Sequence, residues 1–465
     1  MCCAGHVDFP GLASAAGYGR SFRATTCAEL LGLQRMLAST RQPSARAGAV
    51  FVELVTSIDS VANKHLGRPK QSLAAFKDAT CGFLRSKVPP SARAESIVPH
   101  RSETGDPLLF TPGPLTTTAR TKRAMLHDMG SRDCAFEETT SSVLRDLLKL
   151  AHAPAPEFTC VPVQGSGTYA VEAMLTSLVP ADGRVLILEN GAYGRRMGDI
   201  CTVHGLAHTV LSFDEFAPIT GAACSPYMAQ NYTHVAVVHC ETTTGVCNRV
   251  DEIAVVARQH SCALLVDAMS SFAVLDVHAD RWAATCVAFS SNKGLQGVPG
   301  LGFCVVRASE MIVKPARTLT LDLVAQDKAL KETGQWRFTP PTHVMLALRE
   351  ALDELENSGG VAARRARYQA VCTMLLEGMG RAGFTACVAP ESQAPVILAF
   401  SLPEGMCFDA LSSYLRERGF VVYAGKASTR RTFRIGCMGH LPLDSVRSLC
   451  DACSEYAIAQ AQSRE

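Results

Sequence analysis

A lysine and an aspartate stand at the ends of two neighbouring apolar runs. Lys293 comes shortly after the run Thr285 to Ser290, and Asp267 ends the run Leu264 to Asp267, 26 positions before the lysine. Both runs predict buried strands. An amine and a carboxylate so placed suit pyridoxal phosphate, since the amine forms an imine with its aldehyde and the carboxylate keeps its pyridine nitrogen protonated. Singly, each residue is more typical of a turn or a solvated loop; together they predict a catalytic pair.

A glycine-rich turn, Gln164 to Thr168, follows the apolar run Phe158 to Val163 and precedes the helical run Tyr169 to Leu178. Free backbone amides at a helix N-terminus, together with nearby hydroxyl groups, favour a bound phosphate. The turn lacks the GxGxxG spacing and the later acidic residue of a dinucleotide site. An ordinary strand-to-helix connection is the alternative. The predicted phosphate cradle consists of Gly165, Ser166, Gly167 and Thr168.

Two more predicted strands end in residues suited to the same cofactor. Tyr193, in the segment Asn190 to Gly194, is expected to stack on the pyridine ring. Thr242, in the hydroxyl-rich segment His239 to Gly245, is expected to hydrogen-bond the cofactor's phenolic oxygen. Polar loops are the alternative for both. Four strand ends would thus deliver phosphate donors, an aromatic face, an acid and an amine to the sheet edge where open α/β proteins bind ligands.

Two features lie closer to the C-terminus. The segment Gly334 to Thr342 contains two prolines that fix its path, which suits a rigid loop that reaches across a subunit boundary. Arg434 lies on a predicted strand, where its guanidinium is expected to bind a carboxylate or phosphonate through two hydrogen bonds. An ordinary surface arginine is the alternative.

Short β-branched runs alternate with helical segments from about residue 108 to 317, which predicts a mostly parallel sheet with crossover helices. From about residue 342 a long helical stretch leads to a few more strands, which indicates a smaller α/β domain. The predicted strands are Phe158–Val163, Arg184–Glu189, His208–Ser212, His234–His239, Ala263–Asp267, Thr285–Ser290, Gly302–Val306, Val396–Ser401, Val421–Ala424 and Thr432–Gly436.

The composition of the 465-residue chain, 47% of it apolar, favours a large globular protein. No apolar run reaches the roughly 18 residues of a membrane span, and a net charge of +2 argues against nucleic acid or anionic lipid as partners. The 19 cysteines are scattered, as in a reduced, intracellular and most simply cytoplasmic protein. Cys450 and Cys453 form a CxxC without a second pair, so no metal site is predicted.

Residues 1–104 form a predicted helical extension of unknown role, followed by a large cofactor-binding domain (105–341) and a small C-terminal domain (342–465). The extension has 13 Lys and Arg against 7 Asp and Glu. Its apolar spacing predicts helices over Cys27–Leu37, Val50–Ala62 and Leu73–Leu84. The first fifty residues contain five arginines, no lysine and two acids, which makes a mitochondrial transit peptide the alternative for its start.

From about Leu108 to its C-terminus, the chain resembles the 2-aminoethylphosphonate:pyruvate transaminases, of the aminotransferase class V group within the fold-type I pyridoxal phosphate enzymes. The motifs GSRD, HCETTTG, QWRFTPPTH and FRIGCMG are similar to this subfamily in particular. The segments that carry the resemblance are Thr111–Thr116, Gly130–Asp133, Gln164–Thr168, Asn190–Gly194, His239–Gly245, Val266–Phe272, Ser290–Gly302, Gly334–Thr342 and Phe433–Gly439.

The resemblance implies a fold-type I α/β architecture and transfer of the amino group of 2-aminoethylphosphonate to pyruvate, giving phosphonoacetaldehyde and alanine. It gives Lys293, Asp267, Tyr193, Thr242 and the Gly165–Thr168 turn the roles described above. It also implies that Thr339 reaches the cofactor phosphate of a second subunit, which makes a homodimer the active unit, and that Arg434 binds the acidic group of the substrate.

A phosphonate carries more negative charge than one guanidinium can neutralise, so a second polar or cationic group is expected beside Arg434. Arg132 is the predicted residue, and a structural ion pair is its alternative. The chain departs from the family pattern at Cys134, Ala135 and Arg195.

Three other functions remain open. An alanine:glyoxylate or serine:pyruvate aminotransferase would share the cofactor residues. A cysteine desulfurase is disfavoured because no cysteine lies in an obvious glycine-rich loop. A catalytically silent scaffold, with its basic N-terminus bound to a partner, is disfavoured because Lys293, Asp267 and Arg434 are all retained.

Overall fold

The computed structural model describes residues 20–24, 50–54, 99–313 and 315–462. The chain divides into two units, Met1–Glu95 and Ser96–Glu465. In the first unit, strands β1 (Arg20–Ala24) and β2 (Val50–Leu54) pair in parallel. The helix expected from Val50 is therefore wrong at its start, because the β-branched and aromatic run Val50-Phe51-Val52 favours an extended chain once a partner strand is available. The rest of that helix and the other two expected helices lie outside the described residues.

The second unit is built on a seven-stranded sheet with the order β4-β12-β11-β10-β7-β5-β6. Strand β12 runs antiparallel to both of its neighbours, and the other pairs are parallel. The seven predicted strands are confirmed. Their bounds are β4 Phe158–Gln164, β5 Arg184–Glu189, β6 Ala207–Ser212, β7 His234–Val238, β10 Ala263–Asp267, β11 Cys286–Ser290 and β12 Leu301–Arg307.

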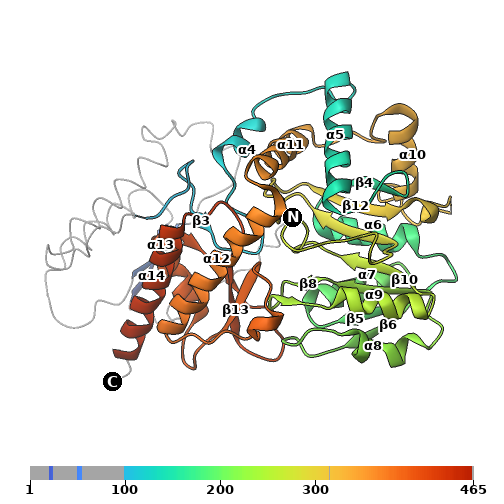
Figure 1. Ribbon diagram of the computed structural model, residues 1–465. Coiled ribbons are helices and arrows are strands. Elements are labelled where there is room, and N and C mark those ends of the chain that lie inside the picture. The colour runs from blue at the N-terminus through green and yellow to red at the C-terminus, as the bar shows by residue number, and fades with distance from the viewer. Residues whose placement is uncertain (1–19, 25–49, 55–98, 314, 463–465) are drawn as a thin grey trace, which may run out of the picture. The chain divides into compact units, whose positions relative to one another are not determined.

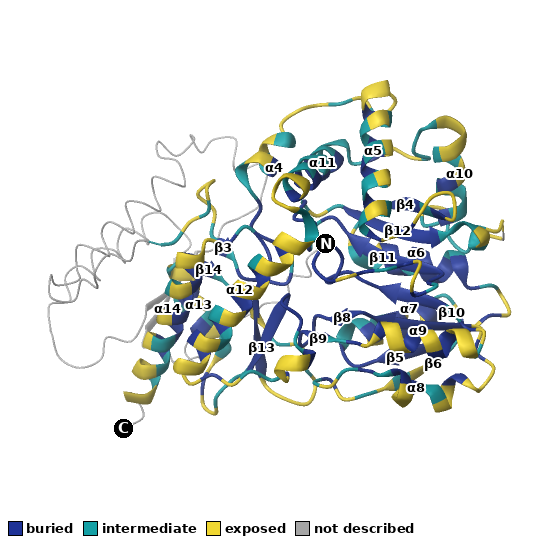
Figure 2. Ribbon diagram, in the orientation of Figure 1, coloured by how far each residue is buried: buried dark blue, intermediate teal, exposed yellow. Residues whose placement is uncertain are grey.

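Helices cover both faces of this sheet (Figure 1). Successive residues of a strand point to opposite faces, so Ile187 belongs to the core that includes α6 and α7, whereas Leu186 and Leu188 belong to the core that includes α5, α8, α9 and α11. The central strands are buried on both sides (Figure 2), which explains their continuous apolar runs. The helices are α5 Cys134–Leu150, α6 Gly167–Leu178, α7 Ala192–Val203, α8 Gly221–Met228, α9 Val250–Gln259, α10 Leu323–Thr333 and α11 Thr342–Asn357.

The C-terminal part forms the smaller α/β layer expected from the sequence. Its antiparallel sheet has the order β13-β16-β15, and it shares one core with three helices. Strand β3 (Leu108–Leu109) pairs with β14, so the chain just after residue 105 packs against this layer. The other elements are α12 Gly360–Arg381, β13 Ile397–Ser401, α13 Phe408–Glu417, β14 Phe420–Val421, β15 Tyr423–Ala424, β16 Thr432–Gly436 and α14 Leu443–Gln462.

The remaining short elements are α4 Ala119–Ala124, β8 Cys240–Glu241, β9 Val246–Cys247 and the 3-10 turns Ala308–Glu310 and Pro390–Ser392. Within the part of the chain that the structure describes, no helix combines the length and apolarity needed to cross a bilayer.

Candidate active site

A cavity of about 210 Å³ lies at the carboxyl ends of the parallel strands. Strands β4, β10 and β11 deliver the Ser166–Thr168 turn, Asp267 and Lys293 to it, and α7 adds Tyr193. Open α/β sheets bind ligands at this edge because the loops that follow parallel strands converge there. The lining residues are Gly113, Ser166, Gly167, Thr168, Val171, Tyr193, Arg196, Asp267, Met269, Ser290, Asn292 and Lys293.

The Lys293 amine lies deep in this cavity. Its Nζ donates a hydrogen bond to the carbonyl oxygen of Pro112 at 2.5 Å. The next residue, Gly113, leaves room for the lysine, since a Cβ at that position would lie 2.6 Å from Nζ. Burial lowers the pKa of the Lys293 amine, which favours the neutral, nucleophilic form.

Asp267 is only 3% exposed and lies beside Lys293 in the cavity. Its Oδ1 accepts a hydrogen bond from the backbone amide of Met269 at 2.8 Å, which fixes the carboxylate. Burial raises the pKa of Asp267 to about 6. A cationic partner would restore its charge, as the protonated nitrogen of a pyridine ring does.

The turn after β4 has the form of a phosphate cradle. Gly165 adopts a φ of +126°, a conformation that favours glycine, and Ser166 is the N-cap residue of α6. A Cβ on Gly167 would lie 2.3 Å from the sulfur of Met269, so a side chain there would crowd the cavity floor. The helix dipole, free amides and hydroxyls of this turn suit a phosphate.

Arg196 adds a cation to this end of the cavity. Its Nη1 donates to Oγ1 of Thr168 at 2.9 Å. Sequence reasoning missed this residue, although it lies three positions after Tyr193 and therefore on the same face of α7. Together, Arg196 and the turn match the double negative charge of a phosphate ester.

Tyr193 is flanked by two cations. The guanidinium carbon of Arg196 lies 4.9 Å from its ring centroid and the amine of Lys426 lies 5.2 Å from it. Burial by itself raises the pKa of the Tyr193 phenol, but the positive charges of Lys293 and Lys426 outweigh that effect and lower it. An electron-rich ring over the cavity is suited to stacking on a cationic heterocycle.

Thr242 and Arg434 lie beside Tyr193, although neither lines the cavity. Thr242 is buried, and its hydroxyl accepts a hydrogen bond from Ser270 at 3.2 Å. Arg434, only 3% exposed, donates to the carbonyl oxygens of Thr242 at 2.9 Å and Ala424 at 3.1 Å. Burial lowers the pKa of the Arg434 guanidinium, and the neighbouring Tyr193 opposes that shift. The small domain thus holds a desolvated cation against the cofactor side of the large one.

An ion-pair network anchors the loop that carries Lys426. Arg195, which departs from the family pattern, pairs with Glu189 at 2.7 Å and with Glu215 at 2.9 Å. Glu215 also accepts hydrogen bonds from the backbone amides of Ser428 at 2.9 Å and Thr429 at 3.3 Å. These contacts join the large domain to residues just beyond Lys426.

Five predicted site residues do not line the cavity of this chain. Gly165, Thr242 and Arg434 adjoin residues that do, which leaves Arg132 and Thr339. Arg132 is exposed just before α5. Thr339 is exposed too, and its carbonyl oxygen accepts a hydrogen bond from the side chain of Gln164. The other predicted residues, Gly165 to Thr168, Tyr193, Thr242, Asp267, Lys293 and Arg434, converge on one region.

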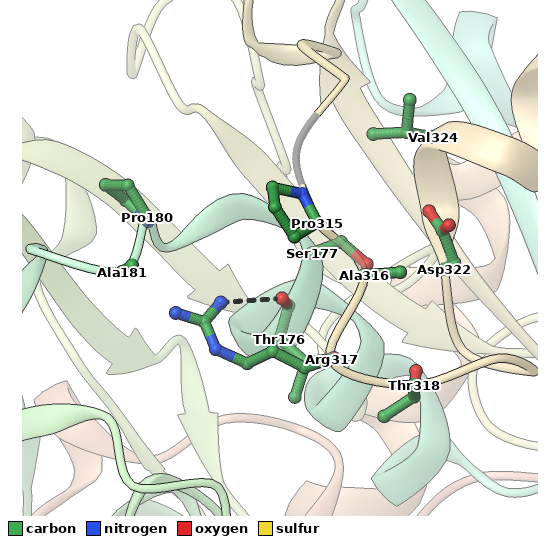
Figure 3. A pocket seen from close by; sticks show the side chains of 10 residues that line it. All are labelled: Thr176, Ser177, Pro180, Ala181, Pro315, Ala316, Arg317, Thr318, Asp322 and Val324. Carbon is green, nitrogen blue, oxygen red and sulfur yellow. Dashed lines mark hydrogen bonds between the residues drawn. The ribbon is translucent and has the colours of Figure 1, made fainter.

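A larger cavity, of about 450 Å³, lies at the other end of α6 (Figure 3). Arg317 donates to the carbonyl oxygens of Thr176 at 3.0 Å and Val179 at 2.7 Å. It therefore caps the negative end of the helix whose positive end forms the phosphate turn. This cavity holds none of the predicted catalytic residues.

The residues present fit pyridoxal phosphate. The residues that line the cavity include the phosphate donors of the Ser166–Thr168 turn, the buried carboxylate of Asp267 and the amine of Lys293. Among the residues that the structure describes, the buried Oγ of Ser290 in the same cavity has no hydrogen-bond partner, so it remains available to a polar ligand.

Comparisons with known proteins agree with this geometry. Residues 118–444 match the model of the family described as aminotransferase class-V. The chain is 44% identical over 355 residues to a "2-aminoethylphosphonate--pyruvate transaminase" from Pseudomonas aeruginosa, covering 75% of this chain and 95% of that protein. A protein of the same name from Paraburkholderia phymatum is 46% identical over 342 residues, covering 72% and 92%.

Solved structures of aminotransferases share this fold. A pyridoxamine-pyruvate aminotransferase from Mesorhizobium loti aligns with a TM-score of 0.69 and 25% identity, covering 77% of this chain and 94% of that one. A Thermus thermophilus aspartate aminotransferase of subgroup IV, 24% identical, shares the fold with a TM-score of 0.69 and coverages of 76% and 99%. The chain belongs to the aminotransferase class-V family and is a pyridoxal phosphate-dependent aminotransferase.

Proposed function

We propose that this enzyme transfers the amino group of 2-aminoethylphosphonate to pyruvate, producing phosphonoacetaldehyde and alanine. The observation that carries the proposal is the buried guanidinium of Arg434, which is hydrogen-bonded to two carbonyl oxygens beside Tyr193. Both of these acceptors are neutral, so the guanidinium can still pair with an anionic group on the substrate. The names of the curated relatives supply the identity of that substrate.

Eight of the predicted site residues have a role toward the cofactor in this proposal. Bound pyridoxal phosphate supplies an aldehyde that accepts the amino group and an aromatic ring that accepts electrons. Lys293 removes a proton from the substrate carbon next to nitrogen and returns it on the cofactor side, a task for which its lowered pKa suits it. Asp267 keeps the pyridine nitrogen protonated. Tyr193 covers the ring, Thr242 binds the phenolic oxygen, and Gly165, Ser166, Gly167 and Thr168 hold the phosphate.

Lys426 is a stronger candidate than Arg132 for the second phosphonate-binding group. Its amine lies 5.2 Å from the Tyr193 ring centroid, and its charge acts on both Tyr193 and Lys293. A phosphonate dianion needs two cations, whereas the carboxylate of alanine or pyruvate needs only the Arg434 fork. Lys426 would therefore favour the phosphonate half-reaction.

Single-turnover spectra of the cofactor, recorded with each amino donor separately, test this division of roles. Arg434→Ala should slow the half-reactions of both 2-aminoethylphosphonate and alanine. Lys426→Ala should slow the first by about tenfold or more and leave the second nearly unchanged. Arg132→Ala is the matched comparison. A selective loss in Arg132→Ala, with Lys426→Ala unaffected, would return the role to Arg132.

A panel of amino donors with pyruvate as acceptor tests the substrate itself. Turnover of 2-aminoethylphosphonate well above that of serine and other amino acids supports the proposal. Preference for alanine with glyoxylate as acceptor would identify an alanine:glyoxylate enzyme instead.

The active unit in this proposal is a homodimer in which Thr339 reaches the cofactor phosphate of the partner. In support, Phe338 is 43% exposed and shares an apolar groove with Tyr169, which is 50% exposed. Exposed aromatic side chains gathered in one groove are typical of interfaces.

Mixed dimers test the Thr339 contact directly. A dimer of one Lys293→Ala subunit and one Thr339→Ala subunit contains one site with both native residues if Thr339 acts across the interface. We expect such mixtures to be more active than either variant alone. No gain on mixing, with dimers verified by light scattering, would contradict the contact.

The compartment in this proposal is the cytoplasm. The arginine-rich first fifty residues, fused to a reporter, test the mitochondrial alternative, since import of the reporter would identify a transit peptide.

A further inference from the structure

A second cluster of ligating side chains lies far from Lys293 in the fold. It consists of His152, just after α5, and of Asp276 and His278, on the loop between β10 and β11. One ligand atom from each residue can be chosen so that all three lie within 4.8 Å of one another. None of these residues lines the cavity that contains Lys293.

The cluster lies toward the opposite edge of the sheet. Arg307, at the end of β12, pairs with Phe158 at the start of β4, and its guanidinium lies 3.7 Å from Asp280 on the same loop. The catalytic edge lies at the other end of these strands, where Leu301 pairs with Gln164. Any ligand bound here would be separate from the transamination site.

The geometry around the Asp276 carboxylate suits a cation. Its Oδ1 lies 3.0 Å from Nε2 of His278 and 3.9 Å from Nε2 of His152. The two imidazole rings stack with centroids 3.8 Å apart and an interplanar angle of 19°. Two imidazoles and one carboxylate oxygen are a donor set that Zn²⁺ and related divalent ions accept, with water completing the coordination. Because the stacked rings are nearly parallel, the half-exposed ring of His152 would turn out of the stack to direct its nitrogen at the ion.

The surrounding residues hold this donor set in position. Nη1 of Arg281 lies 3.9 Å from Oδ2 of Asp276, which leaves Oδ1 toward the histidines, and Arg281 is itself paired with Asp251 at 2.9 Å. The backbone amide of Ala279 donates to the carbonyl oxygen of Ala151 at 2.9 Å and ties the loop to the end of α5. Residues that orient the ligands in this way raise the affinity of metal sites.

We propose that His152, Asp276 and His278 form a binding site for a divalent transition-metal ion of the Zn²⁺ type. The ion would join the end of α5 to the loop between β10 and β11, the strands that lead to Asp267 and Lys293. The site is structural, and it takes no part in the amino transfer.

Calorimetric titration of Zn²⁺ into the reduced, cofactor-loaded full-length enzyme tests the proposal. We expect the wild type to bind one ion at this cluster and to unfold at a higher temperature with Zn²⁺ than without it. His278→Ala should weaken this binding by about tenfold or more and abolish the thermal shift. His127→Ala, which removes an exposed histidine elsewhere, is the matched control and should behave as wild type.

Transaminase activity verifies that the variants are folded, since the cluster lies away from the cavity. If His278→Ala does not fold, Asp276→Asn provides the same comparison with a smaller change. Because exposed thiols such as Cys134 also bind zinc, the absorption spectrum of bound Co²⁺ identifies the ligands. Unchanged affinity in both cluster variants, or a thiolate band in the Co²⁺ spectrum, would overturn the proposal.

Discussion

Burial is the main influence on the two catalytic charges. It raises the pKa of Asp267 to about 6 and lowers the pKa of Lys293, so each shift favours the neutral form. Lys293 gains nucleophilicity in this way, whereas Asp267 becomes a carboxylate that gains from a cationic partner. Each group is held by a hydrogen bond to the backbone, Lys293 to Pro112 and Asp267 to Met269.

Lys293→Ala should lose at least about a hundredfold of transaminase turnover, because no other amine takes over the proton transfer. Lys426→Ala is the control at a neighbouring lysine and should retain the alanine half-reaction. The rate of each half-reaction, followed through cofactor absorbance, measures the effect. Undiminished turnover in Lys293→Ala would remove the catalytic role.

Asp267→Asn should lower turnover by about tenfold or more, which corresponds to at least about 1.4 kcal/mol of transition-state stabilisation. The amide oxygen still accepts the Met269 hydrogen bond, so the change removes the charge while keeping the local structure. Steady-state kinetics with saturating cofactor measure the loss. A smaller effect would mean that the carboxylate does not support the pyridine nitrogen.

At the scale of single elements, predictions follow from the start of α6 and from the residue after β7. The start of α6 passes close to Met269, and the end of β7 leads to the buried ring of His239, which packs edge-on against Trp282. We expect the first feature to affect cofactor binding and the second to affect stability.

Gly167→Ala should weaken cofactor binding, because its Cβ would displace the sulfur of Met269 into the cavity. Gly380→Ala is the matched control, since a Cβ there meets no atom within 4 Å, on an exposed part of α12. Alanine in that helix should stabilise the fold by up to about 1 kcal/mol. Cofactor titration of the two apo variants measures the contrast; equal affinities would show that the cradle tolerates a side chain.

His239 should make the protein less stable as the pH falls from about 6.5 to about 4. Burial lowers the pKa of His239 to about 4, below its ordinary value of 6.5, so the unfolded chain binds the extra proton first. The full loss in the free energy of unfolding is about 3 kcal/mol, and it is reached near the lower pH. Urea unfolding across this range should show a weaker pH dependence in His239→Phe, which keeps a ring beside Trp282. The same pH dependence in His239→Phe and the wild type would contradict the assignment of this effect to His239.

At the scale of the whole molecule, the site depends on contacts between the large and small domains. Arg434 on β16 donates to the Thr242 carbonyl oxygen, and the backbone amides of Ser428 and Thr429 donate to Glu215. In the proposed function, the small domain would therefore supply both cations that face the substrate, Arg434 and Lys426. Substrate choice would then depend on how the two domains pack.

Removal of residues 1–95 should leave an active enzyme, because the unit Ser96–Glu465 contains the sheet and every predicted site residue. Removal of residues 1–104 should give a less stable one. That cut also deletes His100, whose amide donates to Arg418, and Glu103, which pairs with His440 at 2.9 Å. Thermal unfolding and turnover of the two truncations measure the difference; aggregation of the shorter deletion would show that the N-terminal unit covers the core.

The sequence alone predicted the strands of the large domain, which the structure confirms, and the candidate residues of the cofactor site. Strands such as Arg184–Glu189 and Ala263–Asp267 contain continuous apolar runs, because a sheet covered on both faces buries all but the first residue of each. Lys293, Asp267 and the turn at Ser166 each follow such a run directly. Local sequence therefore sufficed to bring them to one edge.

The residues that join this site from distant parts of the chain could be identified only in the tertiary structure. Lys426 lies on a loop more than two hundred positions from Tyr193, and that loop is held by hydrogen bonds from Ser428 and Thr429 to Glu215 rather than by any local pattern. Arg132, chosen for its charge and motif, is exposed in this chain. Val50 to Leu54 form a strand because β1 is there to pair with it. The apolar periodicity of a strand or helix can be read from neighbouring residues. Ion pairs and strand partners depend on packing between segments far apart in the chain, so they cannot be read in that way.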